Sequence, residues 1–297
     1  MRLGLIDLGS NTVKLALYEV QGSTFKQLDF QARFVKILNY IQDGLLSQEG
    51  VLRLVEVLLE YQELCRKNQV ELLECFSTAS LREIENQVQV IAQVQKETGI
   101  IIHPITGEQE AYYNLLGMRM TATEDTFLGQ DLGGGSTQLF TWIQGKPGPS
   151  QSFFLGALKM KQQFVAGELP TREEAQAIQK KAREVLQAAD AFRGLSFSNL
   201  YLMGGSARLL KRLLHAQDGR ISAAAMEELK ERYLDHPDQA KAEILAADPG
   251  RLTTCLPGML VILAGMELFS VKTVRISTSS VREGWLLDWM NRHPANT

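Results

Sequence analysis

The sequence has few of the residues on which a disulfide framework or a zinc site depends. Three cysteines, Cys65, Cys75 and Cys255, are scattered through 297 residues. So small and odd a number does not fit a disulfide framework and favours a reducing compartment. The four histidines share no close spacing, so no zinc site is predicted from them.

An excess of positive charge and a long apolar run are also lacking. Lysine and arginine number 31 against 34 aspartates and glutamates, a net charge of −3 that disfavours a strongly basic nucleic-acid-binding protein. The most apolar run, Gly258 to Met266, is much shorter than the ~20 residues that span a bilayer. The first residues reach Asp7 without the apolar core of a signal peptide. We therefore expect a cytoplasmic protein whose partners include no DNA, RNA or membrane.

What is present is the composition of a globular protein with a sizeable core. Hydrophobic residues make up 45% and charged residues 22%, as in soluble domains, and the length suggests one large domain or two ordinary ones. Predicted strands and helices alternate in both halves, which indicates α/β layers. The predicted helices are 48–68, 81–98, 108–118, 156–165, one opened by Thr171, 207–214, 222–234, 237–247, 257–269 and 281–291, and the predicted single strands are 70–76, 100–105, 200–203 and 273–277.

Two segments share one design, so the chain is predicted to be internally duplicated. Residues 3–20 read as two strands joined by a tight turn, and residues 126–143 repeat them with Asp131-Leu132-Gly133 aligned on Asp7-Leu8-Gly9. Two copies of one supersecondary unit indicate two similar domains facing each other. We place these domains at 1–120 and 121–297, with the final helix 281–291 a candidate for packing on the first.

The turns of both copies are candidate phosphate-binding loops. Their small residues let backbone N–H groups approach an anion, and their hydroxyls add donors. A single such hairpin is more often only a turn, but two, each preceded by an aspartate, favour phosphate. A third candidate loop lies between a strand and a helix, and the N-terminus of a helix also favours an anion. The alternative is a strand-to-helix turn in which the serine is only the N-cap of the helix. The candidates are Gly9, Ser10, Asn11 and Thr12, then Gly133, Gly134, Gly135, Ser136 and Thr137, and finally Gly205 and Ser206.

Charged residues near these loops suggest catalytic roles. Arg82 falls in the first turn of a predicted helix, where the helix dipole disfavours a cation unless a phosphate is bound; the alternative is a solvated surface arginine. Thr106 and Gln109 have capping-box spacing. Glu108 and Glu110 suit the same helix start, and one of them is a candidate to deprotonate a water that attacks phosphate, although spacing does not decide which.

Two aspartates are candidate Mg²⁺ ligands. Asp7 and Asp131 stand at strand ends beside the first two loops, and Mg²⁺ is commonly held by one or two carboxylates together with phosphate oxygens. The alternative role is that of turn aspartates, which bond loop N–H groups.

Taken in order, these motifs resemble those of the exopolyphosphatase/guanosine pentaphosphate phosphohydrolase family. The segments that carry the resemblance are Asp7-Leu-Gly-Ser-Asn-Thr, Ser77-Thr-Ala-Ser-Leu-Arg-Glu-Ile-Glu-Asn, Thr106-Gly-Glu-Gln-Glu-Ala, Asp131-Leu-Gly-Gly-Gly-Ser-Thr, Leu155-Gly-Ala-Leu-Lys and Val281-Arg-Glu-Gly. The resemblance covers essentially the whole chain. It implies the duplicated actin-like fold of the sugar kinase, Hsp70 and actin superfamily, with ribonuclease H-like domains and phosphate in an interdomain cleft. It also implies Mg²⁺-dependent release of terminal phosphate from polyphosphate or guanosine pentaphosphate.

Transferred residue by residue, the resemblance places the family's general base on Glu110 and its phosphate-binding side chains on Asn11 and Arg82. The glycine-rich loop falls on 133–137 and the loop aspartate on Asp131. Longer members carry a further helical C-terminal region, so the resemblance is to a short form.

Several positions depart from the family pattern, and two of them change the side-chain chemistry near the glycine-rich loop. Gln138 stands where an acidic residue is usual, and Lys159, where arginine is common, keeps the charge without bidentate geometry. Gln138 motivates the first alternative to a hydrolase, a non-catalytic sensor that binds polyphosphate or a guanosine alarmone. An ATP-dependent small-molecule kinase is the second, ranked lower because no acceptor motif is evident. The sequence does not decide whether the chain forms a homodimer.

Overall fold

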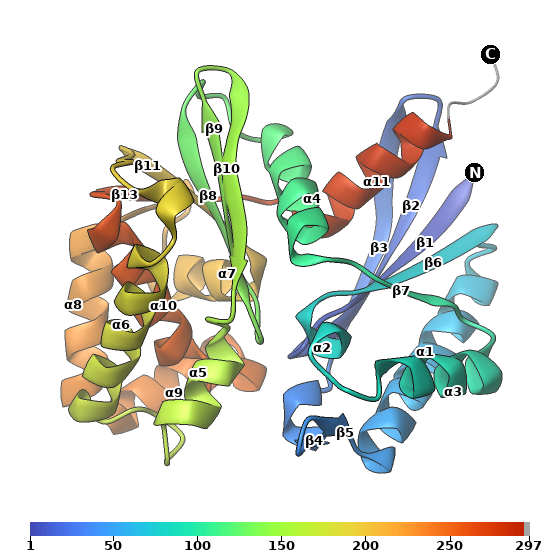
Figure 1. Ribbon diagram of the computed structural model, residues 1–297, viewed down its shortest axis with the longest axis horizontal. Coiled ribbons are helices and arrows are strands. Elements are labelled where there is room, and N and C mark those ends of the chain that lie inside the picture. Colours follow the sequence, from blue (N-terminus) through green and yellow to red (C-terminus); the bar gives the residue numbers. More distant parts are fainter. Residues whose placement is uncertain (294–297) are drawn as a thin grey trace. The chain divides into compact units, whose positions relative to one another are not determined.

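The structure is a computed structural model that describes residues 1–293. The chain divides into two compact units: unit 1 comprises Met1–Gln109 and the chain from Leu286 on, and unit 2 comprises Glu110–Trp285. Both units combine a sheet with helices (Figure 1), so the predicted α/β class is confirmed. Within residues 1–293, no helix has the length and apolar character needed to cross a membrane.

Unit 1 is built on a five-stranded sheet with the order β3-β2-β1-β6-β7. The first three strands are successive antiparallel neighbours, and β6 and β7 run parallel to β1. Its strands are β1 (Arg2–Leu8), β2 (Thr12–Gln21), β3 (Thr24–Phe34), β6 (Leu72–Ser77) and β7 (Ile102–Pro104), with a small hairpin of β4 (Ile41–Gln42) and β5 (Leu45–Leu46). Its helices are α1 (Gln48–Lys67), α2 (Ala79–Arg82) and α3 (Gln87–Thr98).

Unit 2 contains a six-stranded sheet with the order β10-β9-β8-β11-β13-β12. Its strands are β8 (Phe127–Leu132), β9 (Thr137–Ile143), β10 (Lys146–Phe153), β11 (Asn199–Met203), β12 (Arg220–Ser222) and β13 (Thr273–Ile276). Its helices include α5 (Ala157–Phe164), α6 (Arg172–Gln187), α7 (Gly204–Leu213), α8 (Ala223–Asp235), α9 (Pro237–Ala247) and α10 (Cys255–Leu268). Helices α4 (Gly107–Arg119) and α11 (Val281–Arg292) each pass from one unit to the other.

The two sheets repeat one topology, which confirms the predicted duplication and the actin-like fold class. In each, the third, second and first strands of the unit are antiparallel neighbours, and two later strands follow beside the first in parallel. The hairpin register matches as well, because Asp7 pairs with Lys14 and Asp131 pairs with Gln138.

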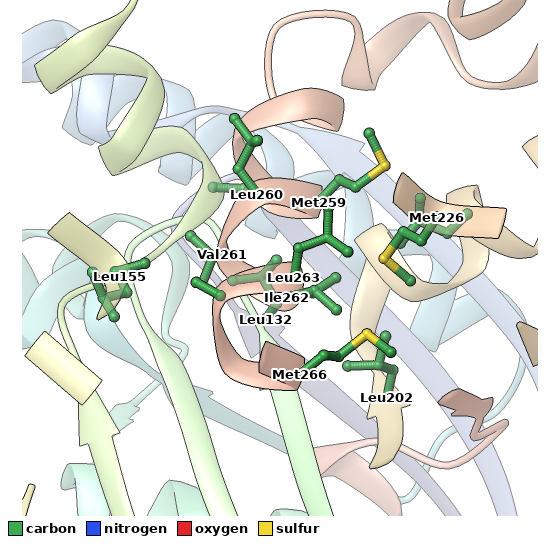
Figure 2. Packing of buried hydrophobic residues seen from close by; sticks show 14 of the residues in the cluster. Leu132, Leu155, Leu202, Met226, Met259, Leu260, Val261, Ile262, Leu263 and Met266 are labelled. Carbon is green, nitrogen blue, oxygen red and sulfur yellow. The ribbon is translucent and has the colours of Figure 1, made fainter. Parts of the chain in front are cut away.

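The core of unit 2 forms around α10. Every residue from Cys255 to Met266 is buried, as the apolar sequence predicts for an internal helix. Its side chains pack against β8, β11 and α8, and Figure 2 shows Leu132, Leu202 and Met226 from these elements around them. The helix therefore supports the strands that end at the phosphate-loop candidates.

The division into units differs from the predicted boundary at residue 120. Helix α4 packs closely on the start of α11: a Cβ added at Gly117 would lie 2.5 Å from the carbonyl oxygen of Ser280, and one at Gly284 would lie 1.7 Å from that of Tyr113. The four residues of this contact, together with α4 from Glu110 on, belong to unit 2.

Some elements differ from the sequence patterns. The predicted helix 81–98 is broken into α2 and α3, and the third strands β3 and β10 were not predicted. Residues of β3 are mostly exposed or half-buried, because it is an edge strand. Its sequence therefore carries little of the hydrophobic alternation by which a strand is recognised.

Candidate functional site

The first loop of unit 1 contains buried polar atoms that lack a protein partner. The amide of Gly9 donates to the carbonyl oxygen of Thr12 over 3.2 Å and closes the hairpin. Ser10, Asn11 and Thr12 are buried, and neither Asn11 Oδ1 nor Thr12 Oγ1 has a hydrogen-bond partner in the part of the chain that the structure describes. Buried polar atoms are usually satisfied, so a ligand at this loop would complete their bonding.

Ser77 belongs with this loop, although the sequence did not single it out. It ends β6 and pairs with Leu8 of the neighbouring parallel strand. It is fully buried, and its Oγ lacks a hydrogen-bond partner among residues 1–293. Ligands of open α/β sheets bind at the carboxyl ends of strands. The serine and threonine run that follows β6 was the available signal.

Arg82 is placed differently from the prediction. It is the last residue of the one-turn helix α2, where the dipole favours a cation. The predicted conflict with a helix N-terminus therefore does not arise. Its Nη1 donates to the carbonyl oxygen of Ile105 over 3.2 Å, which ties the guanidinium to the segment before α4.

Helix α4 distinguishes its two glutamates by burial. The predicted capping box is confirmed: the amide of Gln109 donates to Thr106 Oγ1 over 3.1 Å, and the amide of Thr106 donates to Gln109 Oε1 over 2.9 Å. Glu108 is exposed, and bonds at the helix start, first from its own amide and then from Thr106, lower the pKa of its carboxyl. Glu110 is buried, with 5% of its surface exposed.

The second loop has its carbonyl groups bound and its amides available. The amides of Gly156, Ala157 and Leu158, at the start of α5, donate to the carbonyl oxygens of Gly135, Gly133 and Gly134 over 3.2, 2.9 and 2.9 Å. A Cβ at Gly156 would lie 2.1 Å from the Gly134 oxygen, so this approach requires glycine. The amides of residues 134–136 donate to no group of residues 1–293, as a phosphate loop requires.

The residue opposite each loop aspartate differs between the two copies. In unit 1, Lys14 Nζ lies 2.7 Å from Asp7 Oδ2. In unit 2 the corresponding residue is Gln138, whose Nε2 donates to Ser136 Oγ and Ser152 Oγ over 2.8 and 2.9 Å. Gln138 thus orients a loop hydroxyl, while Asp131 has no lysine opposite it.

The third candidate lies in the first turn of α7. The sequence pattern predicts it between a strand and a helix that begins at Ala207. Gly204 has a φ of 90°, and a Cβ there would lie 2.6 Å from Asp131 Oδ1, so α7 begins beside the loop aspartate. Arg251, which the sequence analysis did not select, covers Gly205: a Cβ at Gly205 would lie 1.7 Å from Arg251 Nη2. Burial lowers the pKa of Arg251 to about 10, and Asp248 opposes this shift.

The model of one phosphatase family, Ppx/GppA, matches residues 18–293. The chain belongs to the Ppx/GppA phosphatase family. The resemblance seen in the sequence motifs is thereby confirmed.

Curated relatives and solved structures resemble the chain along most of its length. Exopolyphosphatase 1 of Mycobacterium bovis is 25% identical over 308 aligned residues, which cover 97% of this chain and 88% of that protein; the protein of the same name from Mycobacterium tuberculosis gives the same values. An exopolyphosphatase structure from Cytophaga hutchinsonii is 20% identical, with a TM-score of 0.89 over 98% of each chain. The Aquifex aeolicus member is 20% identical, with a TM-score of 0.79 over 99% of this chain and 98% of that one.

The two candidate magnesium ligands, Asp7 and Asp131, lie opposite different side chains in the two units. Residues 1–293 contain no group of three or more His, Cys, Asp or Glu side chains arranged to hold a metal. Mg²⁺ needs only one or two carboxylates when phosphate oxygens complete its shell. Asp131 lies opposite a neutral amide, whereas Asp7 is already bonded to an ammonium group. Both aspartates remain predictions as metal ligands for this Ppx/GppA member.

Proposed function

We propose that the chain is a phosphoanhydride hydrolase that releases the terminal phosphate of inorganic polyphosphate. The observation that carries the proposal is the burial of the Glu110 carboxylate on α4. The sequence resemblance assigns the role of general base to this residue. Membership of the Ppx/GppA family and the exopolyphosphatase relatives support the reaction class. Guanosine pentaphosphate is proposed as a second substrate, because it also ends in a phosphoanhydride.

In the proposed reaction, Glu110 accepts a proton from water as the water oxygen attacks the terminal phosphorus. The bond from this phosphorus to the bridging oxygen breaks, which leaves orthophosphate and a polymer one unit shorter. In unit 2, the amides of residues 134–136 are proposed to bind the negatively charged phosphate oxygens. In unit 1, the side chains of Asn11 and Arg82 are proposed as phosphate-binding groups because the sequence resemblance assigns them that role. Preorganised donors of this kind lower the barrier because they are already oriented toward that charge.

Mg²⁺ is proposed as the cofactor, with Asp131 as its carboxylate ligand and Asp7 as a weaker candidate. When bound, it would supply positive charge to the phosphate oxygens. The unpartnered oxygens of Asn11, Thr12 and Ser77 support a polar ligand at the loop of unit 1.

Gln138 favours a second candidate, a sensor that binds polyphosphate or an alarmone without hydrolysing it. Its amide is engaged with two serine hydroxyls, so it adds no carboxylate to the metal environment. A kinase that transfers phosphate from ATP has no observation in its favour.

The test is phosphate release with Mg²⁺ from short polyphosphate, long polyphosphate, guanosine pentaphosphate and ATP, measured side by side. We expect release from polyphosphate, with or without release from the pentaphosphate. Tight binding of polyphosphate with no release would favour the sensor. Release from none of the four substrates would refute the hydrolase.

A further inference from the structure

Three arginine side chains lie along one face of α7 in unit 2. Arg208 and Arg212 follow Gly205 by three and seven residues, so all three positions lie on one side of the helix. Arg251 covers Gly205 on that side. Asp248 Oδ2 bridges two of the arginines, at 2.8 Å from Arg212 Nη2 and 3.4 Å from Arg251 Nε.

Arg208 stands out among them because its charge is unbalanced. It forms neither an ion pair nor a hydrogen bond with any residue in the described part of the chain. Desolvation and the nearby Arg282 lower its pKa, and Asp131 and Glu283 oppose that shift without bonding to it. The side chain is nevertheless exposed to solvent, so a ligand can reach it.

The helix end adds to this positive potential. The amino end of α7 carries the positive end of the helix dipole, and Met203 at the N-cap position supplies no side-chain cap. Asp248 balances part of the charge of the Arg251 guanidinium over the first turn, and Arg208 adds a further positive charge on the same face. Although the whole chain has a net charge of −3, the amino end of α7 and the arginines beside it form a local region of positive charge.

We propose that Gly205, Arg208, Arg212 and Arg251 form a binding face, the α7 arginine face, for the phosphates that follow the terminal one in a polyphosphate chain. The proposal rests on the hydrolase proposed above and names how that enzyme holds a long substrate. From Gly205 to Arg212 the helix rises by about 10 Å, a span longer than one phosphate group. Guanidinium groups bind phosphate oxygens in a bidentate manner, and Gly204 beside Asp131 connects this face to the second loop.

The first test compares a long polyphosphate with triphosphate as substrates of the Arg208→Gln/Arg212→Gln variant. The ratio of kcat/KM for the long chain to kcat/KM for triphosphate should fall at least about tenfold, mainly because the KM for the long chain rises. Each charge-assisted bond to phosphate contributes about a factor of ten or more in affinity. Arg183→Gln is the matched control: Arg183 is a half-exposed arginine of unit 2, paired with Glu267, and its loss should leave the ratio unchanged.

The second test measures binding without turnover. Long polyphosphate is titrated into the protein in the presence of EDTA, and binding is measured by isothermal titration calorimetry. The Kd of the double variant should be at least about tenfold higher than that of the wild type, and its Kd should depend less on the salt concentration. Arg208→Gln alone is included because Arg208 has no ion pair or hydrogen bond within residues 1–293 to lose, and the melting temperature of this variant should match that of the wild type. If the wild-type protein binds polyphosphate through these arginines but releases no phosphate, the proposed hydrolase function is refuted while the proposed α7 arginine face is supported. An unchanged Kd and an unchanged substrate ratio in folded variants would overturn the face alone.

Discussion

Lys14 Nζ donates to Asp7 Oδ2 over 2.7 Å across the first hairpin, and the two residues are register partners on β1 and β2. The repeated hairpin keeps the aspartate, Asp131, but has Gln138 in the place of the lysine. The duplication has therefore produced one carboxylate whose charge is balanced within its own hairpin and one that is opposite a neutral side chain. This difference supports Asp131 as the proposed Mg²⁺ ligand.

Gln138→Lys should convert the second hairpin to the pairing of the first. The new ammonium group would bond to Asp131 as Lys14 bonds to Asp7, so it would compete with Mg²⁺ for the carboxylate. We expect phosphate release to fall at least tenfold, about 1.4 kcal/mol, with a higher Mg²⁺ concentration for half-maximal rate. Gln138→Met is the control without charge. Equal Mg²⁺ dependence in the wild type and both variants would contradict the assignment of the metal to Asp131.

Glu110→Gln should abolish phosphate release while the fold is retained. The amide keeps the shape of the side chain but cannot accept the proton of the attacking water, and general-base catalysis typically contributes about 10²–10⁴-fold. The measurement is kcat with polyphosphate and Mg²⁺, with a melting curve to check folding. Glu108→Gln makes the same charge change two residues earlier on an exposed side chain and should retain most of the activity. Unchanged turnover in Glu110→Gln would exclude it as the base.

Asn114→Leu should stabilise unit 2. Asn114 is fully buried on α4, and neither polar atom of its side chain has a hydrogen-bond partner in residues 1–293. An unsatisfied buried amide costs about 1–3 kcal/mol, and a leucine of similar size removes that cost. Scanning calorimetry should show a melting temperature higher by roughly 2–4 °C per kcal/mol. A lower melting temperature would indicate that the amide is hydrogen-bonded in solution.

The carboxylate of Glu243 should make the free energy of unfolding decrease as the pH falls. Arg232 Nη1 lies 2.6 Å from its Oε1, and Tyr233 Oη donates to its Oε2 over 2.8 Å. Chiefly through the bond from Arg232, the pKa of this carboxyl falls from 4.5 to about 2. Because the folded-state pKa is the lower one, the stabilisation is complete above about pH 4.5 and is lost as the pH falls toward 2.

The matched comparison is Glu243→Gln, which has no carboxylate to titrate. Its melting temperature should be below that of the wild type at pH 7, and the difference should narrow between pH 4.5 and 2. A difference that stays constant over this range would show that the ion pair with Arg232 does not account for it.

Local patterns were sufficient for much of the fold. The duplicated hairpins, the capping box of Thr106 and Gln109, and the buried helix α10 each follow from residues close together in the sequence. The edge strand β3 was missed because its side chains are largely exposed and lack alternation. The break between α2 and α3 was missed because the intervening residues contain neither proline nor glycine.

The sequence by itself determined which residues form the glycine loops, where the two aspartates stand and which family motifs the chain carries. Tertiary structure alone decided that Glu110 is buried while Glu108 is exposed, that Ser77 lies beside Leu8, and that Arg251 covers Gly205. Loop and capping signals depend on backbone conformation and bonds within a few residues, so a short segment contains them. Burial and charge balance depend on side chains brought together from distant segments, and these contacts exist only once the sheets and helices have packed.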